Sequence, residues 1–146
     1  MDEHLVTPEI EIFDSGMLEY ARELIDRGLL KAPHWFQFVL GVRGGAPATA
    51  RELCHLVGSL PPDSRWSVCA IGRHQLPMNM VGMAMGGHVR TGLEDNIYYG
   101  YRQLATSNGQ LVERLARLAG EMGREIASPA EAREMIGVRA VRAGAA

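Results

Sequence analysis

The sequence is poor in several residue types whose abundance marks particular classes of protein. Its 146 residues include two cysteines, Cys54 and Cys69, and a single lysine, Lys31. Two cysteines outside a C-x-x-C pair make neither a disulfide framework nor a thiolate metal cluster. No apolar run approaches the roughly 20 residues of a membrane helix, and the acidic start has no apolar core of a signal peptide. We therefore expect a cytoplasmic protein that does not enter the membrane.

An excess of charge of either sign is also missing. The formal net charge is -2, which argues against a nucleic-acid partner bound through its phosphates. Apolar residues make up 47% of the chain and charged residues 22%, so a packed core is expected. No low-complexity linker or shift in composition interrupts the chain. Residues 1–146 are therefore predicted to form a single domain.

What the sequence does contain is a repeated pattern of strand, Gly-rich turn and helix. Strands alternate or run apolar over a few residues, and helices carry apolar residues at three- and four-residue spacing. Ser128 and Glu131 form a capping box with Pro at the first helical position. The predicted strands span residues 9–13, 36–40, 66–71 and 87–91. The predicted helices span 17–27, 49–57, 77–84 and 111–122, with a short last helix after Ser128 and a frayed tail over 138–146.

Alternating strands and helices predict an α/β fold with a parallel sheet. Two architectures fit: half of a (β/α)8 barrel, whose full length is about 250 residues, or a small open doubly wound sheet. Polar or Gly-rich residues follow the carboxyl end of every predicted strand. Barrel enzymes build their sites at that face, whereas an open sheet concentrates its site at one switch point. The barrel type is therefore favoured.

The densest group of chemically capable residues follows the last predicted strand. His88 and Arg90 point to the same face because side chains alternate along a strand. Glu94 and Asp95 come just after it, in the adjoining loop. A guanidinium beside two carboxylates can fix one as a metal ligand and orient the other as a base. The alternative is a solvated acidic loop that forms salt bridges with Arg90.

Glu11 is a second candidate. It shares a strand face with Glu9 and Phe13, in a strand expected to be buried on both sides. Buried carboxylates are rare unless they are paired or functional. Glu11 is therefore expected to neutralise an inward arginine such as Arg90, to contact a ligand, or both. Glu9 lies one alternation deeper and is expected to be structural.

Six stretches carry a resemblance that covers nearly the whole chain. They are residues 8–16, 38–42, 72–75, 87–96, 107–112 and 129–134. In this order they closely resemble the beta-keto acid cleavage enzymes. The resemblance implies a (β/α)8 TIM-barrel type of fold, in which this chain supplies strands five to eight, a half barrel, and the C-terminal helices.

The resemblance also implies a reaction. The family condenses a β-keto acid with acetyl-CoA and gives acetoacetate and the CoA ester of the shortened acid, with a zinc ion that polarises the keto oxygen. By motif match, Glu94 resembles the zinc-binding glutamate. Asp95 resembles the catalytic aspartate, paired with Arg90 in a dyad. Glu11 resembles the glutamate that contacts the distal group of the substrate.

The chain departs from the family's pattern at the metal. The family's other two zinc ligands form a His-x-His on an earlier strand, and the five histidines here contain no such pair. Zinc sites normally need three protein ligands, so Glu94 alone is expected to bind zinc weakly. Two hypotheses follow. The chain is an enzyme half, inactive until an N-terminal half is supplied, or a non-catalytic half barrel that serves as a pairing module or remains from a truncated gene.

A half barrel leaves two strand edges unpaired, at residues 10–13 and 87–91. Exposed edges promote association. We therefore expect a homo-oligomer, or a complementary N-terminal half-barrel chain as partner.

Two further features keep two interpretations each, and a third departs from the family's pattern. Residues 41–45 serve either a tight turn or a cradle for CoA phosphates. His74 is either a structural hydrogen-bonding group or a contact of the substrate or CoA. Arg43 stands where the family usually has proline, and its charge can alter what the loop binds.

Overall fold

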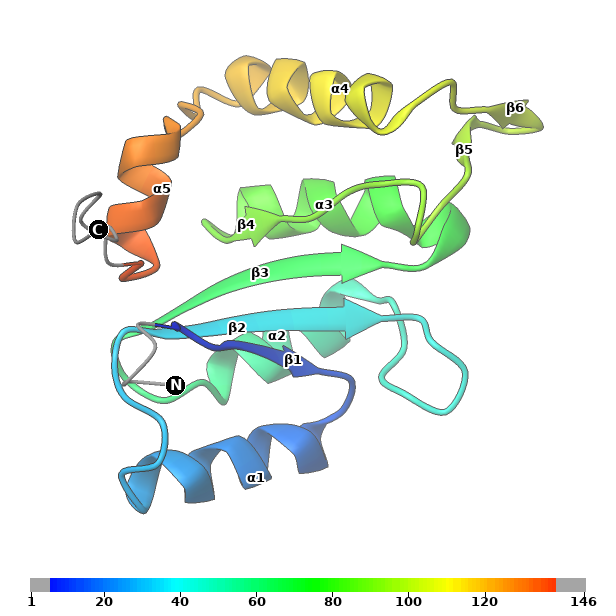
Figure 1. Ribbon diagram of the computed structural model, residues 1–146. Helices are drawn as coiled ribbons and strands as arrows, with labels where there is room; N and C mark the ends of the chain where they lie inside the picture. The colour runs from blue at the N-terminus through cyan, green and yellow to red at the C-terminus, as the bar shows by residue number, and fades with distance from the viewer. Residues whose placement is uncertain (1–5, 139–146) are drawn as a thin grey trace, which may run out of the picture.

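The computed structural model describes residues 6–138 (Figure 1). Along the chain these residues form the following elements: β1 (Glu9–Ile12), α1 (Ser15–Asp26), β2 (His34–Leu40), α2 (Ala50–Gly58), β3 (Ser64–Ala70), a 3-10 turn at Gly72–His74, α3 (Gln75–Ala84), β4 (His88–Val89), β5 (Tyr98–Gly100), β6 (Gln103–Leu104), α4 (Asn108–Glu121) and α5 (Pro129–Met135). The sequence predicts the first four strands and all five α-helices, with bounds that differ by a few residues.

Strands β1 to β4 form one parallel sheet in the order β1-β2-β3-β4. The predicted α/β class with a parallel sheet is confirmed. The strand order follows the chain without reversal, as it does around a barrel and unlike an open sheet with a switch point. The carboxyl ends of the strands all lie at the same end of the sheet, on the right in Figure 1.

Alternation along the strands separates an apolar face from a polar one. Phe36, Phe38 and Leu40 of β2 are fully buried and belong to the same core cluster as Val68 of β3. Helices α1, α2 and α3 add their apolar side chains to this core: Leu18, Ala21, Leu53, Leu56 and Met78. The opposite face carries the candidate site, because Gln37 and Arg90 both donate to Glu11 there.

Helix α3 and strand β4 approach β3 closely at two glycines. A Cβ on Gly82 would lie 2.4 Å from Cγ1 of Val68, and a Cβ on Gly87 would lie 2.3 Å from the ring of Trp66. Any larger residue would push α3 or β4 off the sheet. These two glycines therefore help to fix the position of the segment that leads to Arg90.

The last part of the chain forms an outer layer. Helix α4 packs on α3 through a small cluster that includes Met83, Leu115 and Ala119. Helix α5 lies near the amino ends of the strands, where the hydroxyl of Thr7 donates to the carbonyl of Gly137 at 3.2 Å (Figure 1). The predicted capping box is confirmed: Ser128 and Glu131 exchange hydrogen bonds, and Pro129 begins the helix.

Two expectations need correction. Strand β4 is shorter than the predicted 87–91, because its ladder covers only His88–Val89 and the next residues bond to side chains. The sequence predicts no strand after residue 91, but β5 and β6 pair as a hairpin. The predicted tail over 138–146 lies outside the described residues except for Val138. No helix within residues 6–138 is long and apolar enough to cross a membrane.

Candidate active site

Arg90 lies just beyond β4, at the carboxyl end of the sheet, and its guanidinium contacts three carboxylates. Its Nε and Nη2 donate to the two oxygens of Asp95, at 3.2 Å each. Its Nη1 donates to Oε1 of Glu11 at 3.0 Å, and Nη2 donates to Oε2 of Glu94 at 3.1 Å. The structure therefore brings together the four residues that the sequence predicts for the site.

The three carboxylates differ in their access to solvent. The side chain of Asp95 is only 5% exposed, that of Glu11 is 43% exposed and that of Glu94 is 83% exposed. A two-point contact with a guanidinium fixes both the position and the plane of a carboxylate. Asp95 is therefore held rigidly in a sheltered position, whereas Glu94 extends toward solvent with its carboxylate available to a ligand.

Burial raises the pKa of the Asp95 carboxyl above its ordinary value. The charge and hydrogen bonds of Arg90 oppose this shift, and the nearby Glu94 and Glu11 add to it. A raised pKa makes a carboxylate a stronger proton acceptor. Asp95 combines this property with a fixed orientation, which is what a general base needs.

Glu11 has surroundings different from those expected. The strand was predicted to be buried on both sides, but the face that carries Glu9 and Glu11 is exposed. Besides Arg90, Glu11 accepts a hydrogen bond at 3.2 Å from the amide of Gln37, which is its register partner on β2. Glu9 accepts a hydrogen bond at 3.1 Å from the indole of Trp35, which agrees with a structural role.

Gln37 and Cys69 were missed by the sequence interpretation. Gln37 is 3% exposed and holds the carboxylate of Glu11. Its sequence signal was a lone amide inside the apolar run 36–40, and the register that pairs it with Glu11 is seen only in the structure. Cys69 is fully buried, and burial raises the pKa of its thiol to about 12, so the thiol stays protonated and is not a nucleophile at neutral pH.

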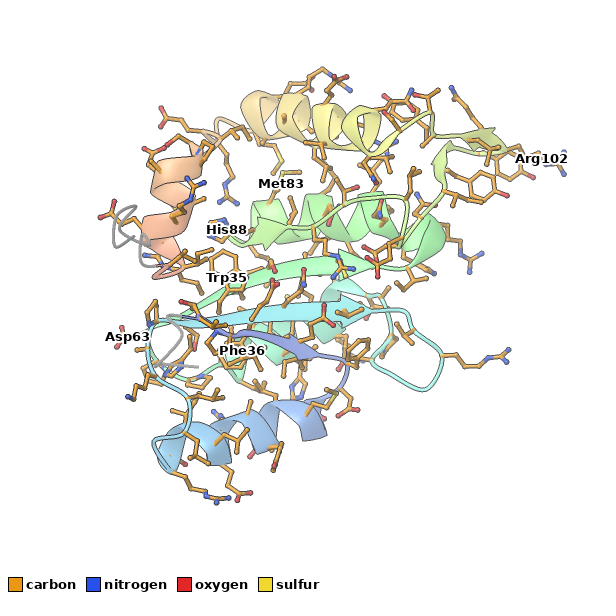
Figure 2. The ribbon with its side chains drawn as sticks, in the orientation of Figure 1. Trp35, Phe36, Asp63, Met83, His88 and Arg102 are labelled. Carbon is orange, nitrogen blue, oxygen red and sulfur yellow. The ribbon has the colours of Figure 1, made fainter. Side chains whose placement is uncertain are left out.

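The two candidate histidines lie outside the carboxylate cluster. The ring of His88 packs at 4.9 Å from that of Trp35, and Figure 2 shows these rings near each other. Burial lowers the pKa of His88, and the charges of Arg124 and Arg65 add to this effect. His74 accepts a hydrogen bond at 3.3 Å from Nε of the neighbouring Arg73.

The donor set within residues 6–138 does not fit a zinc ion by itself. No three His, Cys, Asp or Glu side chains gather there closely enough to hold a metal. Glu94 offers one exposed carboxylate, and zinc needs about four ligands in a tetrahedral site. Residues 6–138 therefore do not form a complete zinc site by themselves.

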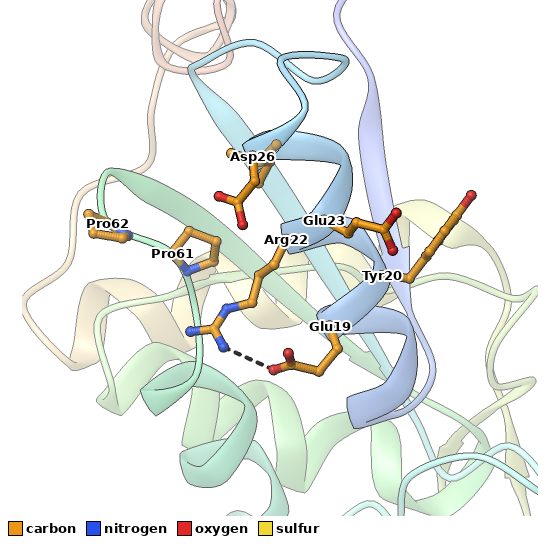
Figure 3. A pocket seen from close by; sticks show the side chains of 8 residues that line it. Glu19, Tyr20, Arg22, Glu23, Asp26, Pro61 and Pro62 are labelled. Carbon is orange, nitrogen blue, oxygen red and sulfur yellow. Dashed lines mark hydrogen bonds and ion pairs between the residues drawn. The ribbon is translucent and has the colours of Figure 1, made fainter.

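A hollow of about 760 Å³ lies away from the candidate site, between α1 and Pro61–Pro62 (Figure 3). Its lining includes Glu19, Tyr20 and Arg22, which all belong to α1. None of the residues predicted for the site lines it. The arginine–carboxylate cluster lies instead on the open polar face of the sheet.

The fold and the arginine–carboxylate cluster define an α/β protein with a polar site at the carboxyl end of a parallel sheet. The sequence profile of the beta-keto acid cleavage enzymes matches residues 1–138. The chain belongs to this family, which confirms the resemblance seen in the sequence.

The chain is similar to several curated members. It is 49% identical over 134 residues to a 3-keto-5-aminohexanoate cleavage enzyme of Fusobacterium nucleatum, an alignment that covers 92% of this chain and 48% of the relative. The enzyme of the same name from Acetoanaerobium sticklandii is 48% identical over 133 residues, which cover 91% of this chain and 49% of the relative. A 3-oxoadipate:acetyl-CoA acetyltransferase of Cupriavidus necator is 38% identical over 141 residues, which cover 94% of this chain and 50% of the relative. The chain therefore spans about half the length of these relatives.

Proposed function

We propose that this chain is the C-terminal half of a (β/α)8 barrel, strands five to eight, that cleaves a β-keto acid with acetyl-CoA as co-substrate. Family membership and the names of the relatives support the reaction class. The single observation that carries the assignment of the site is the two-point contact between Arg90 and the buried Asp95 at the carboxyl end of the sheet.

Asp95 is the base in this proposal. The carbon between the two carbonyls of a β-keto acid is acidic, and Asp95 takes its proton. The resulting carbanion attacks the acetyl carbonyl of acetyl-CoA, and the CoA thiolate leaves. The thiolate then attacks the substrate's original keto carbon, the bond between that carbon and the deprotonated carbon breaks, and the carbanion released takes the proton back from Asp95. The products are acetoacetate and the CoA ester of the shortened acid, and Arg90 holds Asp95 in place throughout.

Glu11 sets the preference for the distal end of the substrate. Its carboxylate lies on the open face of the sheet, fixed by Gln37 and Arg90. Arg90 already shares its positive charge with Asp95 and Glu94. An anionic oxygen of Glu11 therefore remains to attract a cationic group. A substrate that carries an ammonium at its distal end is favoured over a neutral one.

Glu94 supplies one ligand to a zinc ion whose remaining ligands come from outside this chain. The exposed carboxylate fits a single metal bond, and Arg90 fixes its direction through Oε2. When bound, the zinc would act as a Lewis acid toward the keto oxygen. This chain alone is expected to bind zinc weakly, because no three His, Cys, Asp or Glu side chains among residues 6–138 gather closely enough to hold a metal.

The missing half of the barrel is the proposed partner. Strands β1 and β4 are the two edges of the sheet, and each has one neighbour only among the described residues. A complementary N-terminal half barrel would pair with both edges and cover the polar face. A second copy of this chain is the other way to cover those edges, which predicts a homo-oligomer for the chain alone. Both cysteines are free thiols, which agrees with a cytoplasmic protein.

A non-catalytic half barrel is the second candidate. Arg90 already pairs with Glu11, Glu94 and Asp95 within this chain, an arrangement that a purely structural cluster also shows. In this reading the arginine–carboxylate cluster stabilises the fold and turns over no substrate.

Complementation separates the two candidates. The N-terminal half of the Fusobacterium nucleatum relative is coexpressed with this chain, and acetoacetate formation from a β-keto acid and acetyl-CoA is measured. Catalytic turnover in the mixture, and none in either half alone, supports the enzyme proposal. A stable heteromeric complex that binds zinc but forms no acetoacetate supports the pairing module and contradicts the enzyme proposal.

A further inference from the structure

The backbone that carries Arg90 leaves the sheet before it reaches the site. The ladder of β4 ends at Val89, and the last contact with β3 is the bond from the Arg90 amide to the carbonyl of Val68, at 3.0 Å. Beyond this point no strand among residues 6–138 pairs with the chain, and the next backbone contact from the β3 side is the Gly72 amide, which donates to the Asp95 carbonyl at 2.7 Å. Yet residues 90–95 carry three of the four charged groups of the candidate site.

Beyond the sheet, two amide side chains of α3 form hydrogen bonds with this part of the chain. Nδ2 of Asn79 donates to the carbonyl of Arg90 at 3.2 Å. Nε2 of Gln75 donates to the carbonyl of Gly92 at 3.0 Å, and its Oε1 accepts the hydroxyl of Thr91 at 2.9 Å. Three consecutive residues after β4 are thus bonded from one helix.

Gln75 and Asn79 are both fully buried, and they lie four residues apart, on one face of α3. Burying an amide is costly unless its polar atoms are bonded. Oδ1 of Asn79 has no partner among the described residues, so this side chain serves as a donor to Arg90 alone. A leucine would fill the same space without an unbonded oxygen. Simple packing of α3 does not account for an asparagine here.

We propose that Gln75 and Asn79 are positioning residues, which lock the backbone of residues 90–92 so that the guanidinium of Arg90 reaches Asp95 and Glu11 together. The inference rests on the proposed function, because it concerns the geometry of that same site. A guanidinium stands at the end of a long side chain, so a small backbone rotation moves it far. A displacement of about 1 Å in a catalytic group can lower the rate by about a hundredfold.

Other contacts fix the remainder of the loop and supply reporters. The amide of Leu93 donates to Oδ1 of Asn108 at 2.7 Å, and the amide of Asn96 donates to the carbonyl of Gly92 at 3.2 Å. The Gly92 carbonyl is the one that Gln75 also holds. Hydrogen exchange at Leu93 and Asn96 therefore reports directly on whether the loop stays closed.

The first test measures hydrogen exchange by mass spectrometry, with peptides that cover residues 90–97 of the full chain. Asn79→Leu and Gln75→Met keep side-chain volume and remove the bonds. We expect exchange in this segment to be about tenfold faster, since Asn79→Leu removes the side-chain donor to the Arg90 carbonyl and Gln75→Met leaves the Gly92 carbonyl with the Asn96 amide alone. Met78→Leu, a buried neighbour on the same helix without polar contacts to the loop, is the matched control. Equal exchange rates in the control and the two variants overturn the proposal.

Thr91 provides a pair of variants that perturb the structure less, in case the helix substitutions prevent folding. Thr91→Val removes the hydroxyl that Gln75 accepts, and Thr91→Ser keeps it. We expect the valine variant to loosen residues 90–97 and the serine variant to behave as the unaltered chain. Loosening by both variants, or by neither, contradicts a role of the Gln75 contact in holding the loop.

The second test uses the barrel completed with the N-terminal half. There, Asn79→Leu is expected to lower kcat by about ten- to a hundredfold with little change in KM for acetyl-CoA. An unchanged kcat together with faster exchange overturns the positioning role. If the unaltered completed barrel has no activity, the proposed function fails, whereas the exchange experiment still decides whether Gln75 and Asn79 hold the loop.

Discussion

Arg90 donates two hydrogen bonds to the two oxygens of Asp95, at 3.2 Å each, while the Asp95 side chain is only 5% exposed. A paired and sheltered carboxylate of this kind combines a raised pKa with a fixed direction. Glu11 and Glu94 contact the same guanidinium from more exposed positions. The cluster is thus arranged around one cation, the guanidinium of Arg90.

Arg90→Lys keeps the charge but cannot form two parallel bonds to a carboxylate. We expect the free energy of unfolding of the chain to fall by about 1–3 kcal/mol, because Asp95 loses part of its pairing in a sheltered place. In the completed barrel the rate should fall as much as for a variant of Asp95 itself. Arg117→Lys is the control, since its bridge to Glu121 is well exposed and its loss should change stability little. Denaturant unfolding measures the free energy of unfolding of both variants. Equal stability of the two would contradict the account.

Glu11→Gln removes a negative charge from the open face and keeps the size of the side chain. In the completed barrel we expect kcat/KM to fall most for β-keto acids with a distal ammonium, and little for neutral ones, because only the former lose a counter-charge. Glu9→Gln is the matched control on the same strand, with its carboxylate bonded to Trp35. Equal losses for cationic and neutral substrates with Glu11→Gln would contradict the specificity role.

The strands and most helix starts were predictable because their signals are local. The apolar run in 36–40, the glycines after the strands and the Ser128–Glu131 capping box each act within a few residues. The hairpin at 98–104 was not predictable in this way. Its support comes from Arg114 on α4, which donates to the carbonyl of Tyr99 and stacks over its ring at 4.2 Å. A contact between residues fifteen apart is not visible in helical or strand periodicity.

The residues of the candidate site also differ in whether a local sequence signal reveals them. Arg90, Glu94 and Asp95 are neighbours in sequence, so their spacing suggests the cluster, and Glu11 was paired with Arg90 by its face. Gln37 needed the register between β1 and β2, which no local pattern contains. The sequence predicts a helix over 77–84 but assigns no role to Gln75 or Asn79. Their proposed positioning role rests on their bonds to the backbone after Val89, where the ladder ends.

Gly87→Ala should destabilise the fold by about 1–3 kcal/mol, since overpacking forces shifts in a dense core. The added methyl group would lie 2.3 Å from the ring of Trp66. Gly120→Ala is the opposite case, because nothing lies within 4 Å of its Cβ position on helix α4. That variant should stabilise the chain by about 0.5–1 kcal/mol through helix propensity. Thermal unfolding of both variants tests the pair, and the same sign for both would contradict the close approach at Gly87.

The stability of the chain should depend on pH through His88. Its pKa in the native state is lowered from 6.5, chiefly by burial, so the unfolded chain binds the proton more tightly. The contribution of the neutral imidazole is fully present above pH 6.5 and is lost as the pH falls through that value toward the lower native pKa.

His88→Phe keeps a ring against Trp35 and removes the titration. Unfolding free energies at about pH 7.5 and about pH 5.5 are compared between the unaltered chain and the variant. We expect the unaltered chain to lose more stability on acidification than the variant does. The control His55→Gln removes an exposed histidine and should retain the full dependence. A variant at His88 with an unchanged pH dependence would show that the lowered pKa is wrong.

The central claim is that Asp95 is the base of a β-keto acid cleavage reaction in a barrel that this chain completes. The most direct measurement is the rate of acetoacetate formation by the chain combined with the N-terminal half of the Fusobacterium nucleatum relative, with Asp95 or Asn at this position. Asp95→Asn keeps the shape and removes the proton acceptor, so the rate should fall by about 10²-fold or more while the zinc content and the assembly of the two halves stay unchanged. Turnover by the Asp95→Asn barrel at the rate of the unaltered one would contradict the claim.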